Sequence, residues 1–320
     1  GAHGFIGSHV TDRLIQLGHK VVAVDNHSAV SNDRFYTHHK SDSFIEDVCD
    51  YDFMAGLFRK YKFDYVFHLA AIARIQLGVS NPVETAKTNY VGTQVLLDLC
   101  NKHGIKKFIF SSTSSSYGLM NKIPLNEDME PDCLTPYSVA KVASEKLCQT
   151  YFKTFNVPTI SLRYFNVYGE REPIKGEYAP VVGLFLRQRK ECQPLTVVGD
   201  GLQTRDFTYI KDAVAANILA MDCGESCAGE TFNIGTGQNY SILEIAETIS
   251  QNIKYIPERV GESRDTQADI SKANTLLTML DQAEALWLQT QTLIESQDAD
   301  TKLSIYNSDD YKNAHAALLY

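Results

Sequence analysis

Short runs of consecutive apolar residues alternate, along the first half of the chain, with longer segments whose apolar positions recur every three or four residues. The short runs predict buried strands and the longer segments predict amphipathic helices. The strands predicted in this way are residues 21–24, 65–69, 108–110 and 159–162, and the clearest helices are residues 85–103 and 137–155. Because strands separated by helices are typical of βαβ units, we predict an α/β fold with a doubly wound parallel sheet and helices on both faces.

The pattern becomes less regular after residue 165, where glycine and proline interrupt the apolar runs. Such interruptions are typical of loops, short strands and short helices. We therefore predict a main domain over residues 1–165, a smaller α/β lobe over residues 166–275, and a divergent helical tail over residues 276–320. The tail is polar, and its apolar residues have helix-like spacing. This pattern predicts a surface helix followed by a weakly ordered end.

Composition excludes several classes of protein. Hydrophobic residues make up 44% of the chain and no apolar run is long enough for a membrane span. A net charge of -9 argues against broad nucleic-acid binding, which needs a surplus of Lys and Arg. The seven cysteines are scattered without zinc-type spacing, so we expect reduced thiols and no bound metal. No secretory signal is visible at the start, so we expect a cytoplasmic protein.

Three glycines at the start of the chain, Gly1, Gly4 and Gly7, have the spacing of a dinucleotide-binding loop and precede a predicted helix. Glycines let such a loop turn tightly and approach a pyrophosphate, whose charge the helix N-terminus favours. A strand normally precedes this loop. We therefore expect that the first strand of the fold is missing from this chain.

An acidic residue, Asp25, follows the next predicted strand, about 20 residues after the glycine loop, where a carboxylate can accept a hydrogen bond from an adenosine ribose. The Asp25 carboxylate would repel a 2′-phosphate, which favours NAD over NADP as the cofactor. His27 and Arg34 lie nearby in the sequence, so NADP remains the alternative cofactor. A third strand, ending at Asp47 and Val48, could meet the adenine. Alternatively, Asp47 is a solvated turn residue.

A tyrosine and a lysine, Tyr137 and Lys141, lie four residues apart and therefore on one face of a predicted helix. The ammonium favours the phenolate and lowers the tyrosine pKa, which makes Tyr137 a candidate general base. Spacing alone is weak evidence, because Tyr36 and Lys40 share it. The later pair is distinguished by the hydroxyl-rich residues 111–118, which follow a predicted strand at the edge where open α/β sheets bind ligands.

A series of short motifs, taken together, resembles the NAD-dependent epimerase/dehydratase family of nucleotide-sugar enzymes, which are extended short-chain dehydrogenases/reductases. The motifs are the glycine loop, His68-Leu69-Ala70-Ala71, Asn89-x-x-Gly92-Thr93, Tyr117-Gly118, Tyr137-x-x-x-Lys141, residues 163–169 and residues 199–207. They occur in consistent order over residues 1–275. The resemblance implies a Rossmann-like fold with NAD as cofactor, a smaller C-terminal lobe that binds a UDP-sugar, and a homodimer paired through residues 85–103 and 137–155.

The resemblance also implies roles for individual residues. Tyr137 would be the acid/base on a sugar hydroxyl, Lys141 would hold the nicotinamide ribose, and Thr113 would share a proton relay. The implied cofactor contacts are Gly1, Gly4, Phe5, Ile6, Gly7, Asp25, Asn26, Asp47, Val48, Leu69, Ala70, Ala71, Asn89, Ser111, Tyr137, Lys141 and Tyr164. The implied substrate contacts are Arg74, Thr113, Ser114, Ser115, Tyr137, Asn166, Arg205, Arg259 and Thr266.

Two of these residues, Arg205 and Arg259, match arginines that grip the diphosphate in the family. Guanidinium groups suit phosphate oxygens, and an acidic protein needs local cations to bind an anionic ligand. A plain surface role remains the alternative for each arginine.

The resemblance favours one reaction within the family. Dehydratases carry an Asp-Glu pair directly after the catalytic threonine, and decarboxylases carry a Glu near the second of these positions. Ser114 and Ser115 stand here instead, which favours a 4-epimerase over a dehydratase or a UDP-glucuronate decarboxylase. Thr266 matches a position where bulky aromatic residues exclude N-acetylated sugars, so UDP-N-acetylglucosamine/UDP-N-acetylgalactosamine is the favoured substrate pair, unless Thr266 only packs.

A protein of another class, a non-catalytic Rossmann protein that binds a dinucleotide as a structural or sensing ligand, is the remaining alternative. A sensor needs only the cofactor loop. The presence of Thr113, Tyr137 and Lys141 together therefore argues for an enzyme.

Overall fold

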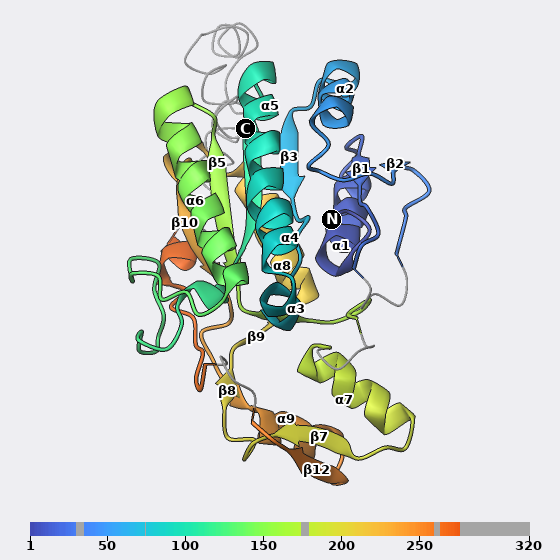
Figure 1. Cartoon of the computed structure of the whole chain (residues 1–320), viewed down its shortest axis with the longest axis vertical. Coiled ribbons are helices and arrows are strands. Elements are labelled where there is room, and N and C mark those ends of the chain that lie inside the picture. The colour runs from blue at the N-terminus through green and yellow to red at the C-terminus, as the bar shows by residue number, and fades with distance from the viewer. Residues whose placement is uncertain (30–34, 74, 174–178, 259–262, 276–320) are drawn as a thin grey trace, which may run out of the picture.

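A parallel sheet of four strands forms the centre of the fold (Figure 1), within the residues that this computed structural model describes: 1–29, 35–73, 75–173, 179–258 and 263–275. The strand order is β10 (Thr231–Ile234), β5 (Thr159–Tyr164), β4 (Lys107–Thr113) and β3 (Tyr65–His68). A separate parallel pair joins β1 (Val22–Val24) to β2 (Asp42–Phe44). The strands predicted from the apolar runs are therefore confirmed, with β4 longer than expected at its carboxyl end.

Helices cover both faces of the central sheet, which explains why its strands read as continuous apolar runs. Every residue of β4 and β5 is buried. Helices α2 (Tyr51–Tyr61), α5 (Gly92–His103) and α6 (Pro136–Phe155) pack in one core with Phe108 and Phe110, and Figure 1 shows α5 and α6 in front of the sheet. Helices α1 (Phe5–Gln16) and α8 (Ile210–Asp222) share the other core with Ile109. The predicted doubly wound, Rossmann-like arrangement is confirmed.

The helix predicted over residues 85–103 is divided into several elements. The range contains the end of α4 (Pro82–Ala86), a π-helical turn η1 (Lys87–Val91) and α5, and a separate short helix α3 (Ile75–Ser80) precedes it. The wide turn places Asn89 inward, where its side chain bonds both backbone groups of Ile72. Such π-turns occur often at functional sites, and no apolar periodicity reveals them in the sequence.

The helix predicted from residue 137 begins at an N-terminal cap formed by Thr135. The Oγ1 of Thr135 accepts a hydrogen bond from the Ser138 amide, and Pro136 occupies the first helical position. A short 3-10 turn η2 (Ser114–Ser116) directly follows β4. These two features set where Tyr137 and the hydroxyl-rich segment lie.

The elements after β5 form a smaller lobe, seen below the central sheet in Figure 1. They are β6 (Asn166–Tyr168), α7 (Val181–Lys190), β7 (Leu195–Val198), β8 (Thr204–Arg205), β9 (Phe207–Tyr209), β11 (Tyr240–Ser241), α9 (Ile242–Ile249) and β12 (Ile253–Ile256). Phe185 and Leu195 are at the centre of the lobe's own apolar core. Between β9 and β11 the chain returns to the central sheet and forms α8, the 3-10 turn η3 (Glu225–Cys227) and β10. The smaller lobe is therefore built from two segments of the chain, one before and one after this return.

The predicted tail, residues 276–320, lies outside the described residues. None of the helices within the described ranges is long and apolar enough to cross a membrane.

Candidate active site

A cavity of about 850 Å³ lies at the carboxyl ends of the central strands. Most of the residues predicted from the sequence line it, namely Gly1, Gly4, Phe5, Ile6, Gly7, Asp25, Asn26, Val48, Leu69, Ala70, Ala71, Ser111, Thr113, Ser114, Ser115, Tyr137, Lys141, Tyr164, Asn166, Arg205 and Thr266. Ligands of open α/β sheets bind at this edge. Asp47 and Asn89 are not among the lining residues, and Arg74 and Arg259 lie outside the described residues.

The glycine loop packs too closely against the chain to accept larger side chains. A Cβ on Gly7 would lie 2.1 Å from the carbonyl oxygen of Gly1, and one on Gly1 would lie 2.4 Å from the backbone nitrogen of Ala70. Helix α1 starts directly after Gly4, which provides no side-chain cap for the first amides of the helix. A tight loop that leads into an uncapped helix N-terminus at the cavity wall suits a pyrophosphate.

The carboxylate of Asp25 is fixed at the end of β1, on the cavity wall. Its oxygens accept hydrogen bonds from the amides of His27, at 2.8 Å, and His3, at 3.1 Å. An anion held there suits a ribose that offers two hydroxyl donors and disfavours a 2′-phosphate. Together with the glycine loop, this carboxylate fits NAD.

The third strand differs from the prediction. Strand β2 ends at Phe44, and the Asp47 carboxylate turns to the protein, where it accepts hydrogen bonds from the Cys49 amide and the Asn26 side chain. The neighbours of Asp47, Glu46 and Val48, line the cavity instead. The sequence could not distinguish these positions, because the residues after β2 are not in a regular strand.

The side chain of Asn89 also lies behind the cavity wall. Its Nδ2 donates to the carbonyl of Ile72 at 3.1 Å, and its Oδ1 accepts from the Ile72 amide at 2.8 Å. Ile72 itself lines the cavity. Asn89 thus holds the segment after β3 in place, and direct contact with the cofactor stays a prediction.

The candidate catalytic residues come together from two elements. Tyr137 and Lys141 lie one turn apart on α6, and Thr113 ends β4. The Nζ of Lys141 donates to the carbonyl oxygen of Ser111 at 2.7 Å, which ties α6 to β4. The Oγ1 of Thr113 accepts from the Ser115 amide at 3.1 Å, so the hydroxyl hydrogen remains available for donation.

Of the three candidate catalytic side chains, Lys141 carries the charge, and burial changes its pKa. It lowers the pKa of Lys141 from 10.5 to about 8, while the nearby carboxylate of Glu145 acts in the opposite direction. Lys141 is therefore a cation at neutral pH and lies one helical turn from the Tyr137 phenol, whose ionised form a cation stabilises.

A second tyrosine at the site is held neutral. Burial raises the pKa of Tyr164 to about 12, and its hydroxyl accepts a hydrogen bond from Asn217 Nδ2 at 2.7 Å. Tyr164 therefore forms part of the wall as an uncharged phenol.

On the lobe side of the cavity, Arg205 and Thr266 line the wall. Arg205 Nη1 donates to the carbonyls of Thr204 and Arg264, which joins β8 to the segment before Thr266. The Thr266 amide donates to the carbonyl of Thr204 at 3.2 Å, and the Thr266 Oγ1 is buried without a hydrogen-bond partner among the described residues. Thr266 therefore contributes a small side chain to the wall, whereas its hydroxyl oxygen is closed to the cavity.

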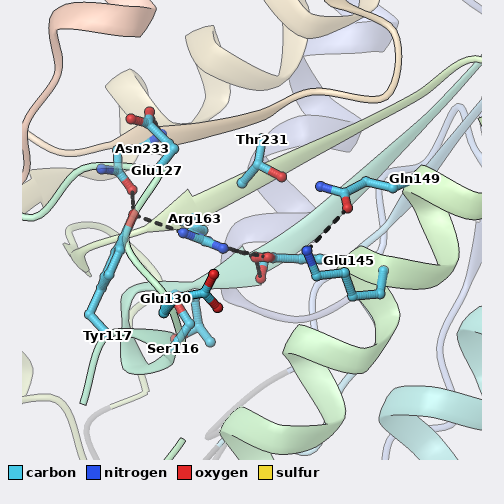
Figure 2. A network of polar contacts seen from close by, with 12 residues as sticks. Ser116, Tyr117, Glu127, Glu130, Glu145, Gln149, Arg163, Thr231 and Asn233 are labelled. Carbon is cyan, nitrogen blue, oxygen red and sulfur yellow. Dashed lines mark hydrogen bonds and ion pairs between the residues drawn. The ribbon is translucent and has the colours of Figure 1, made fainter. Parts of the chain in front are cut away.

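Several residues of the site were not identified from the sequence. Glu46, Thr196 and Ile242 line the cavity, and none of them belongs to a motif. A buried ion pair between Glu145 and Arg163 lies behind the catalytic helix (Figure 2). Helical spacing could have indicated the first of these two, because Glu145 follows Lys141 by four residues.

Comparison with known proteins agrees with this geometry. Residues 1–235 match the NAD dependent epimerase/dehydratase family. The chain is 35% identical over 293 residues to an uncharacterized UDP-glucose epimerase of Bacillus subtilis, covering 87% of this chain and 90% of that protein. It is 38% identical to a UDP-N-acetyl-alpha-D-glucosaminuronate decarboxylase of Bacillus cytotoxicus, covering 78% of each chain.

A solved structure is also similar. The UDP-glucose 4-epimerase of Thermotoga maritima, crystallised with UDP-glucose, superimposes with a TM-score of 0.81 at 36% identity, covering 86% of this chain and 90% of that one. The chain therefore belongs to the NAD dependent epimerase/dehydratase family, and it is an enzyme that uses NAD.

Proposed function

We propose that the enzyme catalyses 4-epimerisation of a UDP-sugar. The observation that carries this proposal is that Thr113, Tyr137 and Lys141 line one cavity, while Ser114 and Ser115 occupy the positions after Thr113. Serine hydroxyls cannot replace the carboxyl groups that elimination of water requires as a general acid and base. The names of the Bacillus subtilis and Thermotoga maritima relatives support the same reaction.

The enzyme's own residues account for the proton transfers. Bound NAD supplies the redox chemistry at the sugar's fourth carbon. The Tyr137 phenolate takes the proton from the 4-hydroxyl and returns it after the sugar has turned in the site, while the Thr113 hydroxyl holds the same oxygen by a hydrogen bond. Lys141, a buried cation, stabilises the phenolate and holds the nicotinamide ribose.

For the substrate, we propose an N-acetylated hexose on UDP. Thr266 is small and lines the cavity. An acetamido group would fill the space that a bulky side chain at this position would occupy. The diphosphate would be bound by Arg205, because this acidic protein needs a local cation there.

For the assembly, we propose a homodimer. Val83 on α4 and Val139 on α6 are 80% and 53% exposed, and these two helices pack against each other. Apolar side chains exposed on neighbouring helices suit an isologous interface in which helices pair across a two-fold axis.

A panel of UDP-, GDP- and dTDP-sugars tests the reaction and the substrate together. We expect interconversion of UDP-N-acetylglucosamine and UDP-N-acetylgalactosamine, identified by chromatography of the products. Loss of carbon dioxide from a uronic acid substrate, or formation of a 4-keto-6-deoxy sugar, would overturn the assignment. Absence of any reduced-nicotinamide absorbance with every sugar nucleotide would favour a non-catalytic protein that binds a dinucleotide.

A further inference from the structure

A buried carboxylate, that of Glu145, joins the catalytic helix to two strands of the central sheet (Figure 2). Its Oε1 accepts hydrogen bonds from Ser112 Oγ on β4, at 2.5 Å, and from Arg163 Nε on β5, at 2.9 Å. Its Oε2 accepts from Arg163 Nη2 at 2.7 Å. The two-pronged geometry is the strong form of an arginine–carboxylate pair, and it fixes both partners in direction as well as distance.

The same network continues across the sheet to its edge strand, β10. Arg163 Nη1 donates to the Tyr117 hydroxyl at 3.0 Å, and that hydroxyl donates to Asn233 Oδ1 on β10 at 2.6 Å. The Asn233 Nδ2 donates to the carbonyl of Leu125 at 2.8 Å. All four side chains from Glu145 to Asn233 are buried, so each bond lies in surroundings where an unmatched polar group is costly.

Glu145 stands next to the catalytic residues without reaching the cavity. It follows Lys141 by one turn of α6, and its partner Ser112 is the neighbour of both Ser111, which accepts from Lys141, and Thr113. Neither Glu145 nor Arg163 is among the residues that line the cavity. Their partners Ser112 and Tyr117 do line it, so an effect on a bound sugar passes through these two side chains, through Lys141 and through the position of β4 relative to α6.

We propose that Glu145 is a positioning residue for the reaction, because its carboxylate, shared between Ser112 and Arg163, sets how α6 lies against β4 and keeps an anion beside Lys141. This inference rests on the proposed epimerase function. Arg163 contributes to this positioning, because its guanidinium orients the Glu145 carboxylate and donates a hydrogen bond to the Tyr117 hydroxyl.

The groups around the Lys141 ammonium show that the Glu145 carboxylate supplies the negative charge beside it. Among the described residues, the ammonium faces, besides Glu145, the Cys148 thiol of α6, His68 on β3 and two groups of β4, namely the carbonyl of Ser111 and the uncharged ring of Phe110, whose centroid is 4.8 Å away. Burial, followed by the charge of Lys141, lowers the pKa of His68, so this imidazole is neutral. Burial raises the pKa of Cys148 well above neutrality. Within the described part of the chain, Glu145 is therefore the anion that opposes the loss of the Lys141 proton at neutral pH.

The test removes the ion pair without leaving one buried charge alone. In the double variant Glu145→Gln/Arg163→Met, Lys141 loses its neighbouring anion and a larger share of it is neutral, so the Tyr137 phenolate is less favoured. Tyrosinate absorbance, recorded as the difference between each protein and its own Tyr137→Phe partner, follows this single phenol and needs no sugar nucleotide. We expect Tyr137 to titrate about one pH unit higher in the double variant, and kcat at neutral pH to fall about tenfold with little change in KM.

The matched control is Glu130→Gln, which removes one exposed carboxylate close to the network (Figure 2) and should leave both quantities unchanged. A conservative variant, Glu145→Asp, keeps the charge but shortens the reach to Ser112 and Arg163. It should lower kcat and leave the Tyr137 titration in place.

A folded double variant with an unchanged Tyr137 titration would overturn the electrostatic part of the proposal, and parental kcat in Glu145→Asp would overturn the positioning part. The second outcome applies even if the double variant does not fold. If no sugar nucleotide is turned over, the epimerase proposal fails, while the titration still decides whether Glu145 acts on the catalytic pair.

Discussion

The ammonium of Lys141 lies 2.7 Å from the carbonyl oxygen of Ser111, to which it donates a hydrogen bond, and this contact fixes the catalytic helix against the end of β4. Burial at this position lowers the pKa of Lys141 from 10.5 to about 8. Between these two values the unfolded chain binds a proton that the folded chain has lost, so stability contributed by this residue rises with pH across this window. Below about pH 8 the folded protein bears the full cost of a buried charge.

The first prediction follows from that cost. Lys141→Met should abolish turnover and raise the free energy of unfolding at pH 7 by about 1–3 kcal/mol, since the lowered pKa corresponds to an upper limit of roughly 3 kcal/mol. The gain should shrink as the pH rises above about 8 and vanish above about pH 10.5, where Lys141 is neutral in the folded and the unfolded chain. Urea denaturation at several pH values measures it, with the exposed Lys146→Met as the control. A destabilised Lys141→Met protein at pH 7 would contradict the argument.

The general base gives the second prediction. Tyr137→Phe removes the group that takes the proton, so we expect kcat to fall by about 10²–10⁴-fold. Binding of the UDP-sugar should hardly change, because the lost contact acts mainly in the transition state. Steady-state kinetics together with calorimetric titration of UDP-sugar separate the two effects. Near-parental turnover would remove Tyr137 from the mechanism.

The strands and helices around the cavity were predictable from sequence because their signals are local. The fully buried β4 and β5 read as apolar runs, and the Tyr137–Lys141 pair follows from helical spacing. The π-turn at Asn89 was not predictable, since it depends on hydrogen bonds to Ile72 across 17 residues of chain.

The lobe was harder to predict, because long-range contacts build its part of the site. Thr266 reaches the cavity wall through a bridge between Thr204 and Asp265 and through its amide's bond to Thr204, contacts between segments about 60 residues apart that no local pattern encodes. The strands involved are also short: β8 contains two residues. The family resemblance identified Thr266 where spacing alone could not.

Cofactor choice gives the third prediction. Asp25→Ala removes the carboxylate that repels a 2′-phosphate, so the preference for NAD over NADP should narrow by about tenfold, as measured by calorimetry. Asp47→Ala is the informative comparison, because Asp47 bonds to the protein outside the cavity lining and should leave the ratio unchanged. Equal affinity for both cofactors in the unmutated protein would refute the assignment of Asp25.

The fourth prediction concerns the dimer. Light scattering at micromolar concentration should give twice the mass of the chain, and Val83→Asp with Val139→Asp should halve that mass by placing charges in the apolar interface. Leu186→Asp on α7 is the control, since Leu186 is 52% exposed and Val139 is 53% exposed. A monomer mass for the parent protein would contradict the proposed assembly.

The last prediction separates space from hydrogen bonding at Thr266. Thr266→Tyr adds bulk to a wall that an acetamido group is proposed to face, and overpacking a filled site typically costs about 1–3 kcal/mol. It should therefore lower kcat/KM for UDP-N-acetylglucosamine much more than for UDP-glucose. Thr266→Val keeps the size of the side chain and removes the hydroxyl, whose oxygen is closed to the cavity.

Because that oxygen is closed to the cavity, Thr266→Val should leave kcat/KM for both sugars nearly unaffected and serves as the control for the change in size. Equal losses on both sugars in Thr266→Tyr would indicate general damage to the segment that Thr204 anchors. An unchanged ratio of the two kcat/KM values in Thr266→Tyr would show that Thr266 does not face the sugar. The substrate would then be a UDP-hexose whose second carbon is contacted by other residues, because the small size of Thr266 at the cavity wall is the structural feature that favours an acetamido group.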